Sequence, residues 1–111
     1  MIEKTEHTLP LLSGKQKKFL KGLSHHLSPV IQIGKEGITE GLIAATEIEL
    51  LHHELIKVKI GNNNDLEKND TGQVLSEATG SNLVQIIGKT LLLYRKNPKR
   101  AKEERIVLPK G

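Results

Sequence analysis

The stretch that decides the fold is PVIQIGKEGITEGLIAATEIELLHHELIKVKI, residues 29–60. It opens with a short, β-branched apolar run that ends at Gly34, as a strand does. Residues 38–54 then carry apolar side chains at helical spacing, and residues 55–60 alternate apolar with charged. A strand, a helix and a second strand in this order predict a βαβ crossover, which makes the two strands parallel.

The patterns inside this stretch predict which side chains face the core. We expect the helix to bury a broad apolar face made of Leu42, Ala44, Ala45, Ile48 and Leu51. Three glutamates repeat every seven residues on another side and indicate a solvated stripe, Glu40, Glu47 and Glu54. In the strand 55–60 the isoleucines and the valine point one way, and Lys57 and Lys59 point to a wet face of the sheet.

The flanking sequence completes one mixed sheet. A helix is expected from Ser13 to Ser28-Pro29, with an apolar arc of Phe19, Leu20, Leu23 and Leu27 opposite Lys17, Lys18 and Lys21. A weaker helix, 66–79, is interrupted by Gly72 and ends at Gly80, and strands 81–87 and 90–95 form a hairpin about Gly88-Lys89. Residues 105–108 offer a further edge strand. The order α-β-α-β-α-β-β predicts an α+β fold, a two-layer sandwich with helices on one face of a four-stranded mixed sheet.

Composition predicts one small domain. The chain has 111 residues, no cysteine and no apolar run of about 18 residues that could span a membrane. We expect residues 1–10 to be a flexible arm and residues 11–111 a single domain, with a basic tail from residue 96. The absence of cysteine and of an export signal predicts a cytoplasmic protein without membrane contact.

No set of residues predicts an enzyme, a cofactor site or a metal site. Gly88-Lys89-Thr90 resembles the end of a phosphate-binding P-loop, but Leu83 stands where that motif requires glycine. His25-His26 and His52-His53 point about 100° apart within each pair, and no further ligand stands at a metal spacing. Glutamates seven apart on a helix are separated by about 10.5 Å, which is too far for a shared metal.

The charge distribution points to a polyanionic partner. Lysine and arginine number 17 against 13 acidic residues, which gives a net charge of +4. The only aromatic residues are Phe19 and Tyr94, so a platform of several exposed rings for stacking bases is excluded. If nucleic acid binds, lysine contacts to its phosphates must therefore supply most of the affinity.

The four residues Gly34, Lys35, Glu36 and Gly37 fit two interpretations. Chance alone supplies a GxxG in this chain roughly once. A tight turn with Thr39 as the helix cap explains them without any ligand, and the residues alone favour that interpretation. A glycine turn before a helix N-terminus can also admit a phosphate close to the backbone, with Lys35 adding charge and Glu36 opposing it.

Three blocks in order resemble a known family. LSGKQKKFLKGLSHHLSPVIQIGKEGITEGL, HHELIKVKI and VQIIGKTLLLYRK are similar to the signature blocks of the CRM domain (chloroplast RNA splicing and ribosome maturation), in its stand-alone bacterial YhbY-like form. The match runs from about Leu12 to Leu108. The resemblance implies a fold similar to the C-terminal domain of translation initiation factor three. It also implies a GxxG loop analogous to that of KH domains, which clamps RNA backbone.

The resemblance implies a monomeric, non-catalytic protein that binds large-subunit ribosomal RNA in a pre-50S particle and assists ribosome assembly. The alternative is a protein-interaction module recruited to the ribosome through a ribosomal protein or an assembly factor. The predicted RNA-binding residues are Gly34, Lys35, Glu36, Gly37, Lys15, Lys17, Lys18, Lys21, Lys57, Lys59, Lys89 and Arg95.

Overall fold

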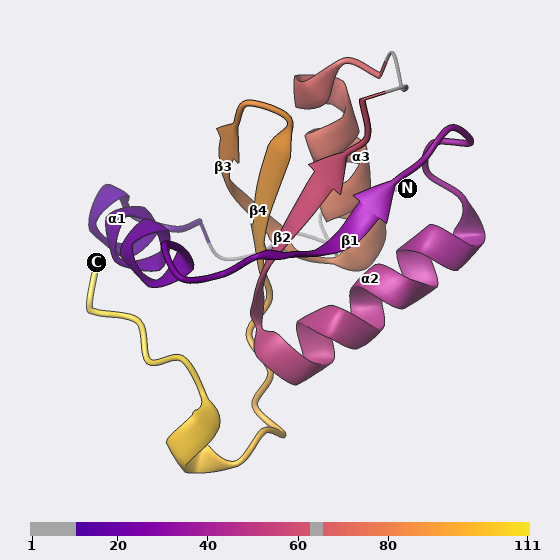
Figure 1. The fold of residues 1–111 in the computed structure, drawn as a ribbon. Coiled ribbons are helices and arrows are strands. Elements are labelled where there is room, and N and C mark those ends of the chain that lie inside the picture. The colour runs from indigo at the N-terminus through magenta and orange to yellow at the C-terminus, as the bar shows by residue number, and fades with distance from the viewer. Residues whose placement is uncertain (1–10, 63–65) are drawn as a thin grey trace, which may run out of the picture.

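The computed structural model describes residues 11–62 and 66–111, so the predicted arm at residues 1–10 lies outside the described part. Its elements follow the predicted order and end in a short 3-10 helix that the sequence did not predict (Figure 1). They are α1 Gly14–Ser24, β1 Pro29–Ile33, α2 Glu40–His53, β2 Leu55–Ile60, α3 Lys68–Thr79, β3 Asn82–Ile87, β4 Thr90–Tyr94 and η2 Lys102–Glu104.

The four strands form one mixed sheet in the order β1-β2-β4-β3. β1 and β2 are parallel, as the crossover predicted, and β4 is antiparallel to both β2 and β3. The β3–β4 hairpin turns at Gly88, whose φ of 58° lies in the left-handed region that favours glycine. The α+β class, the order of elements and the mixed sheet are confirmed.

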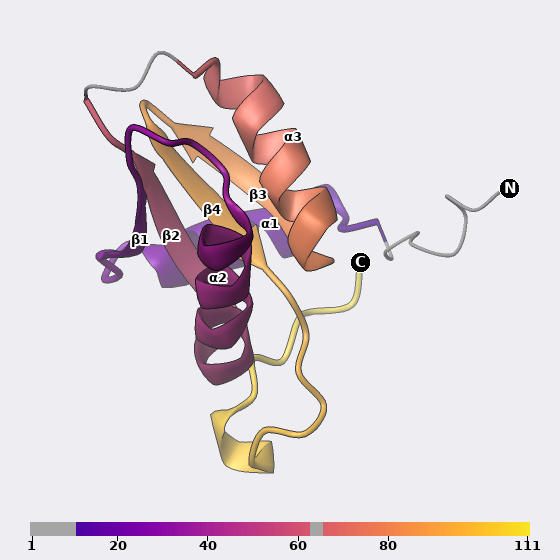
Figure 2. The same ribbon diagram turned by 90° about the vertical axis from the view of Figure 1, so that its right-hand side faces the viewer.

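The prediction that all helices cover one face is wrong for α1. α2 and α3 pack on the sheet face that presents Ile56, Val58 and Ile60, and together they bury Leu50 and Leu75. α1 crosses the opposite face, where Leu20 packs in a separate cluster with Leu55, Val84, Leu92 and Tyr94 (Figure 2). β4 supplies apolar side chains to both faces, because Leu91 and Leu93 alternate with Leu92 and Tyr94.

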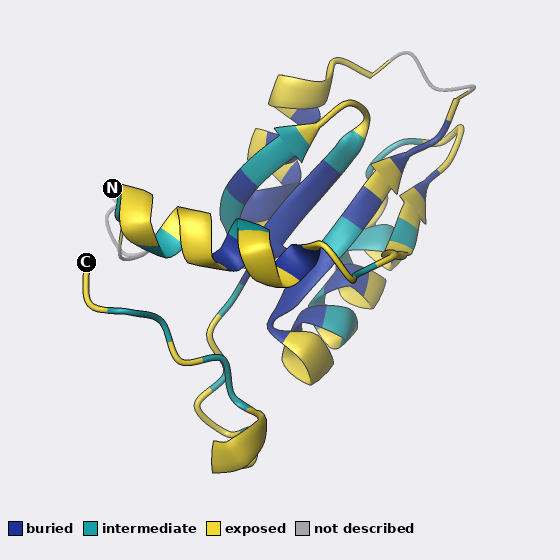
Figure 3. Cartoon of the chain, turned by 60° about the vertical axis from the view of Figure 1, so that its left-hand side comes forward, coloured by how far each residue is buried: buried dark blue, intermediate teal, exposed yellow. Residues whose placement is uncertain are grey.

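α1 begins at a capping box, in which the Ser13 hydroxyl accepts from the Gln16 N–H and the Gln16 side chain accepts from the Ser13 N–H. Its inward residues are Leu20 and Ser24. The predicted apolar arc is therefore only partly buried, because Phe19 and Leu23 are 38% and 40% exposed and lie on the flank of the helix. Figure 3 shows α1 lying across the sheet with most of its outer surface exposed.

The side of α2 that is buried differs from the predicted one. The helix begins at Glu40 rather than Ile38, because Thr39 is the N-cap and its hydroxyl accepts from the Leu42 N–H at 3.1 Å. The inward side consists of Leu42, Ile43, Thr46 and Leu50. Thr46 fits this core because its hydroxyl donates to the Leu42 carbonyl at 2.7 Å. Apart from Leu42, the predicted apolar face is exposed, and this part of the prediction is wrong.

α3 packs closely although it contains few large apolar side chains. A Cβ on Gly72 would lie 2.9 Å from Leu83 Cδ2 of β3, so the glycine permits the close approach of helix and sheet. The helix begins at Lys68, two residues later than predicted. It ends at Gly80 in the left-handed conformation, as the sequence predicted. Gly72 is therefore a packing position rather than an interruption.

The C-terminal segment 96–111 is anchored through Glu54, and it forms no edge strand. Glu54 is fully buried just after α2, which corrects its assignment to a solvated stripe. Its carboxylate accepts from Arg100 Nη1 at 3.0 Å and from the backbone N–H groups of Asn97 and Ile106, both at 2.8 Å. Ile106 and Leu108 then pack beside the α1 cluster. The predicted tail is thus part of the folded structure.

Candidate functional site

The Gly34–Gly37 loop is a tight turn that follows β1. The Gly37 N–H donates to the Gly34 carbonyl at 3.0 Å, and Gly37 has a φ of 75°. A side chain is strained at that φ, so the second glycine is required by the backbone itself. A Cβ on Gly34 would meet nothing within 4 Å, so the approach to the backbone on that side is open. The turn lines a shallow hollow of about 450 Å³ with Thr39, Gly41 and Leu42.

The structure confirms the turn interpretation of this loop, and the phosphate interpretation stays a prediction. The turn and the Thr39 cap are present, and Ile38 and Thr39 separate the turn from the first residue of α2. The positive end of the helix is partly opposed by Glu40 in the first turn and by exposed Glu36. The loop therefore carries no net positive charge of its own, and cations that bind an anion here must come from neighbouring elements.

Backbone hydrogen bonds bring two further segments to the same end of the sheet. The Gly61 N–H donates to the Ile33 carbonyl at 2.9 Å, and the Ile60 N–H donates to the Lys89 carbonyl at 2.8 Å. The Gly34–Gly37 turn, the end of β2 and the Gly88-Lys89 hairpin therefore lie together. We call this group, with Lys59, the loop end of the sheet.

Lys57 and Lys59 both face the α1 side of the sheet, but their side chains differ in exposure and in hydrogen bonding. Lys57 is half-buried, and its ammonium group donates to the Leu27 carbonyl at 3.1 Å, below the end of α1. Lys59 is exposed and lies between Gln32 of β1 and Thr90 of β4. Lys57 is thus partly structural, while Lys59 is available to a ligand at the loop end.

Two lysines of α1 face the loop end. Gln16 marks the opposite flank, because its side-chain amide donates to the Pro109 carbonyl of the C-terminal segment at 2.9 Å. Leu20 faces the sheet, and Gln16 lies to one side of it. At about 100° per residue, Lys17 and Lys21 lie on the other side of Leu20, away from Gln16. Lys15 and Lys18 point outward from the sheet by the same geometry. We call the α1 lysines with Lys57 and Lys59 the basic face.

Arg95 is not part of this group. Its backbone N–H donates to the Glu54 carbonyl at 2.8 Å, which places it at the end of the sheet away from the Gly34–Gly37 turn. Its side chain is half-buried and donates to the Thr79 carbonyl at 3.2 Å. The structure therefore brings together the glycine turn, Lys35, Lys59 and Lys89, with the α1 lysines beside them, and leaves Arg95 apart.

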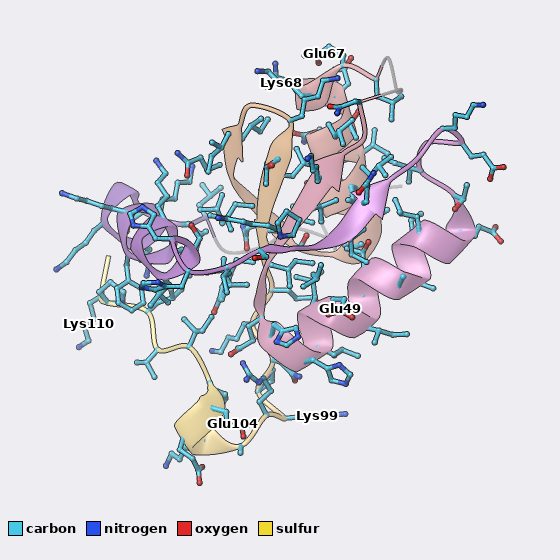
Figure 4. The ribbon with its side chains drawn as sticks, in the orientation of Figure 1. Glu49, Glu67, Lys68, Lys99, Glu104 and Lys110 are labelled. Carbon is cyan, nitrogen blue, oxygen red and sulfur yellow. The ribbon has the colours of Figure 1, made fainter. Side chains whose placement is uncertain are left out.

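Charge is divided between the two faces of the molecule. α1 contains four lysines and no acidic residue. α2 and α3 together contain Glu40, Glu47, Glu49, Asp70 and Glu77 against the single cation Lys68. In Figure 4, Glu49 lies on α2, whereas Lys110 lies beside α1. Within the described residues, ion pairs involve His53 and Arg100, so the candidate lysines have no carboxylate partner there.

The sequence analysis missed two neighbours of Lys59. Gln32 and Thr90 flank it across the sheet, and both can donate hydrogen bonds to phosphate or ribose oxygens. The available signal was their polar character at alternating positions of strands β1 and β4. Their adjacency to Lys59 required the strand order.

Residues 11–62 and 66–111 contain no group of three or more potential metal ligands. No helix in these two ranges is long and apolar enough to cross a bilayer.

Comparison with protein families decides the relationship. The model of the family described as "CRS1 / YhbY (CRM) domain" matches residues 12–95, from the segment before α1 to the end of the sheet. The chain belongs to the CRM-domain family. The match includes the Gly34–Gly37 turn, Lys59 and Lys89, and it ends before the C-terminal segment that Glu54 anchors.

CRM-domain relatives cover most of this chain. A Haemophilus influenzae protein named "RNA-binding protein" is 46% identical over 99 residues, 89% of this chain and 96% of its own. "Probable RNA-binding protein YqeI" of Bacillus subtilis is 41% identical over 87 residues, 78% of this chain and 91% of its own. The solution structure of SAV1595 from Staphylococcus aureus matches with a TM-score of 0.73 and 42% identity, over 89% of this chain and all of that one.

Proposed function

We propose that this CRM-domain protein binds RNA without catalysing a reaction, through the loop end of the sheet and the basic face. The observation that carries the proposal is the convergence of the glycine turn with Lys35, Lys59 and Lys89 at one end of the sheet, beside Lys17 and Lys21. The names of the relatives from Haemophilus influenzae and Bacillus subtilis support the same activity.

The local charges indicate what each part of the proposed surface contributes to RNA binding. The turn lets a sugar–phosphate backbone approach without a Cβ at Gly34. Because Glu36 and Glu40 offset Lys35, attraction to the phosphates comes mainly from Lys59, Lys89 and the α1 lysines. The acidic outer side of α2 and α3 repels RNA, so the complex has one orientation. Such contacts fix position on the RNA and read few bases.

The proposed target is the ribosomal RNA of a large-subunit precursor, with a role in assembly of that subunit. This finer assignment rests on the single-domain form of the family that the three sequence blocks resemble. A structured RNA also fits a surface that has phosphate-directed lysines and no set of stacking rings. In cells, crosslinks from this chain should therefore map to large-subunit ribosomal RNA.

The loop is tested by replacing Lys35 and Glu36 together with aspartate. Labelled transcripts of large-subunit ribosomal RNA domains serve as the ligand, and fluorescence anisotropy measures Kd at several salt concentrations. Reversing one charge beside a phosphate should raise Kd by about tenfold or more. The thermal melting curve should not change, because both side chains are exposed.

Lys99→Asp is the matched control, because it changes the net charge equally at an exposed position of the C-terminal segment. It should leave Kd within about twofold of the unchanged chain. Lys59→Ala should lower the slope of log K against log salt by about 1 if Lys59 contacts a phosphate. Equal Kd values for the Lys35/Glu36 variant and the unchanged chain would remove the loop from the RNA-binding surface.

A further inference from the structure

α2 carries a second apolar side that faces away from the sheet and is largely exposed. Its inward side packs on the sheet, yet Ile48 is 52% exposed and Leu51 is 46% exposed. Gly41, Ala44 and Ala45 continue this exposed side toward the start of the helix. At helical spacing these positions form one band along the outside of α2. We call the band Gly41, Ala44, Ala45, Ile48 and Leu51 the outer strip.

A surface helix needs only one apolar side. α1 and α3 follow this rule more nearly, because their outer positions are mostly charged or polar. A helix that is apolar on opposite sides is normally buried on both. α2 packs against α3, β1 and β2 through its inward side, and the residues of the outer strip are exposed in the part of the chain that the structure describes. The composition of α2 therefore fits a helix that is covered by another molecule.

The borders of the outer strip indicate what covers it. Glu40 and Glu47 lie along one border, and Glu49 lies along the other. These carboxylates disfavour RNA and anionic lipid surfaces, and they favour a partner with lysine or arginine beside its apolar residues. A second copy of this chain fits poorly, since a twofold axis through the centre of the strip would bring both Glu47 side chains together.

We propose that the outer strip of α2 binds a basic amphipathic helix of another protein, on the opposite side of the molecule from the basic face. The apolar residues of that helix pack on Ile48 and Leu51, and its lysines or arginines pair with Glu40, Glu47 and Glu49. The chain then links RNA on one face to a cationic protein on the other. The two surfaces adjoin at Gly41, which also lines the hollow beside the Gly34–Gly37 turn. Ile48 and Leu51 lie about two to three helical turns further along α2, so changes at these positions separate protein binding from RNA binding.

The test places the photo-crosslinking amino acid p-benzoylphenylalanine at Ala45, and in a second variant at Ile48, of the full chain in cells. After irradiation and nuclease digestion, mass spectrometry identifies the crosslinked peptide. The expected adduct joins the chain to a peptide with net positive charge and apolar residues at helical spacing. Val30, which is 45% exposed on another element, is the matched control position and should give no such adduct.

Leu51→Asp should reduce the adduct from Ala45 by about tenfold. It should leave the RNA affinity unchanged, because the side chain lies away from the basic face, and it should lower the melting temperature by only a few degrees, because Leu51 is 46% exposed. Absence of an adduct at both positions, an adduct with a second copy of the chain, one with a neutral or acidic peptide, or equal yield from Val30 would each overturn the proposal.

Discussion

Glu54→Gln tests the anchor of the C-terminal segment. The carboxylate is fully buried, and Oε1 accepts from Arg100 and Ile106 while Oε2 accepts from Asn97. Glutamine has nearly the same size, but its NH₂ group must face at least one of these donors. One buried N–H then loses its acceptor, and the Arg100 guanidinium loses its charged partner. These two losses should lower the free energy of unfolding by about 2–4 kcal/mol.

Urea unfolding followed by circular dichroism measures this change. Hydrogen exchange of the Asn97 and Ile106 amides should become faster, since both amides donate to Glu54. The free energy of opening calculated from these rates should fall by a similar amount. Glu104→Gln is the control, because Glu104 is 65% exposed and lies 4.0 Å from the same arginine. It should change stability by less than about 0.5 kcal/mol.

A Glu54→Gln variant within about 0.5 kcal/mol of the unchanged chain would refute the anchor. An equal loss in Glu104→Gln would do so as well, because it would assign the effect to general charge rather than to the buried carboxylate. In either case the C-terminal segment would be held by the packing of Ile106 and Leu108 alone.

Further outcomes follow from the packing and capping. Gly72→Val should lower stability by about 2 kcal/mol or more in urea unfolding, because its Cβ would crowd Leu83 Cδ2 at 2.9 Å. Gly22→Ala, with nothing within 4 Å of the added Cβ, should instead raise it by about 0.5 kcal/mol. Thr39→Ala removes the cap of α2 and should cost about 1 kcal/mol in the same assay. The backbone N–H of Asp70, followed by that of Asn69, lowers the pKa of Glu67. The stability that the Glu67 carboxylate contributes is therefore complete above its ordinary pKa and is lost as pH falls. Between about pH 5 and about pH 3, the free energy of unfolding should thus fall less in Glu67→Gln than in the unchanged chain.

Periodicity predicted the elements well where a single pattern dominated. β2 alternates, and its bounds and the burial of Ile56, Val58 and Ile60 are confirmed. The expected wet face is wrong, because α1 packs on that side and Lys57 is half-buried there, while Lys59 is exposed. The stop signals at Gly80 and Gly88 are confirmed because both positions adopt a positive φ that glycine tolerates without strain.

Periodicity failed for α2 because that helix is apolar on more than one side. Two apolar bands satisfy the same spacing, and the sequence does not say which one meets the sheet. The structure buries the band that contains Thr46, whose hydroxyl is satisfied within its own helix. The assignment of Glu54 to the solvated stripe was likewise wrong. Its seven-residue spacing from Glu47 indicates the same side of a helix only if the helix continues, but α2 ends at His53.

The sequence by itself determined the order of elements, the parallel pairing of β1 with β2, and the glycine turn with its nearby cap. These depend on local propensity and on the connection between neighbouring elements, which are short-range in the chain. Tertiary structure alone decided that α1 crosses the opposite face of the sheet and that the segments carrying Lys35, Lys59 and Lys89 lie at the same end of it. It also decided that Glu54 holds a segment some fifty residues later, as its bond to Ile106 spans 52 positions. The reason is that both faces of β4 are apolar, so helices can cover either one, and only the packed sheet selects which side each helix takes.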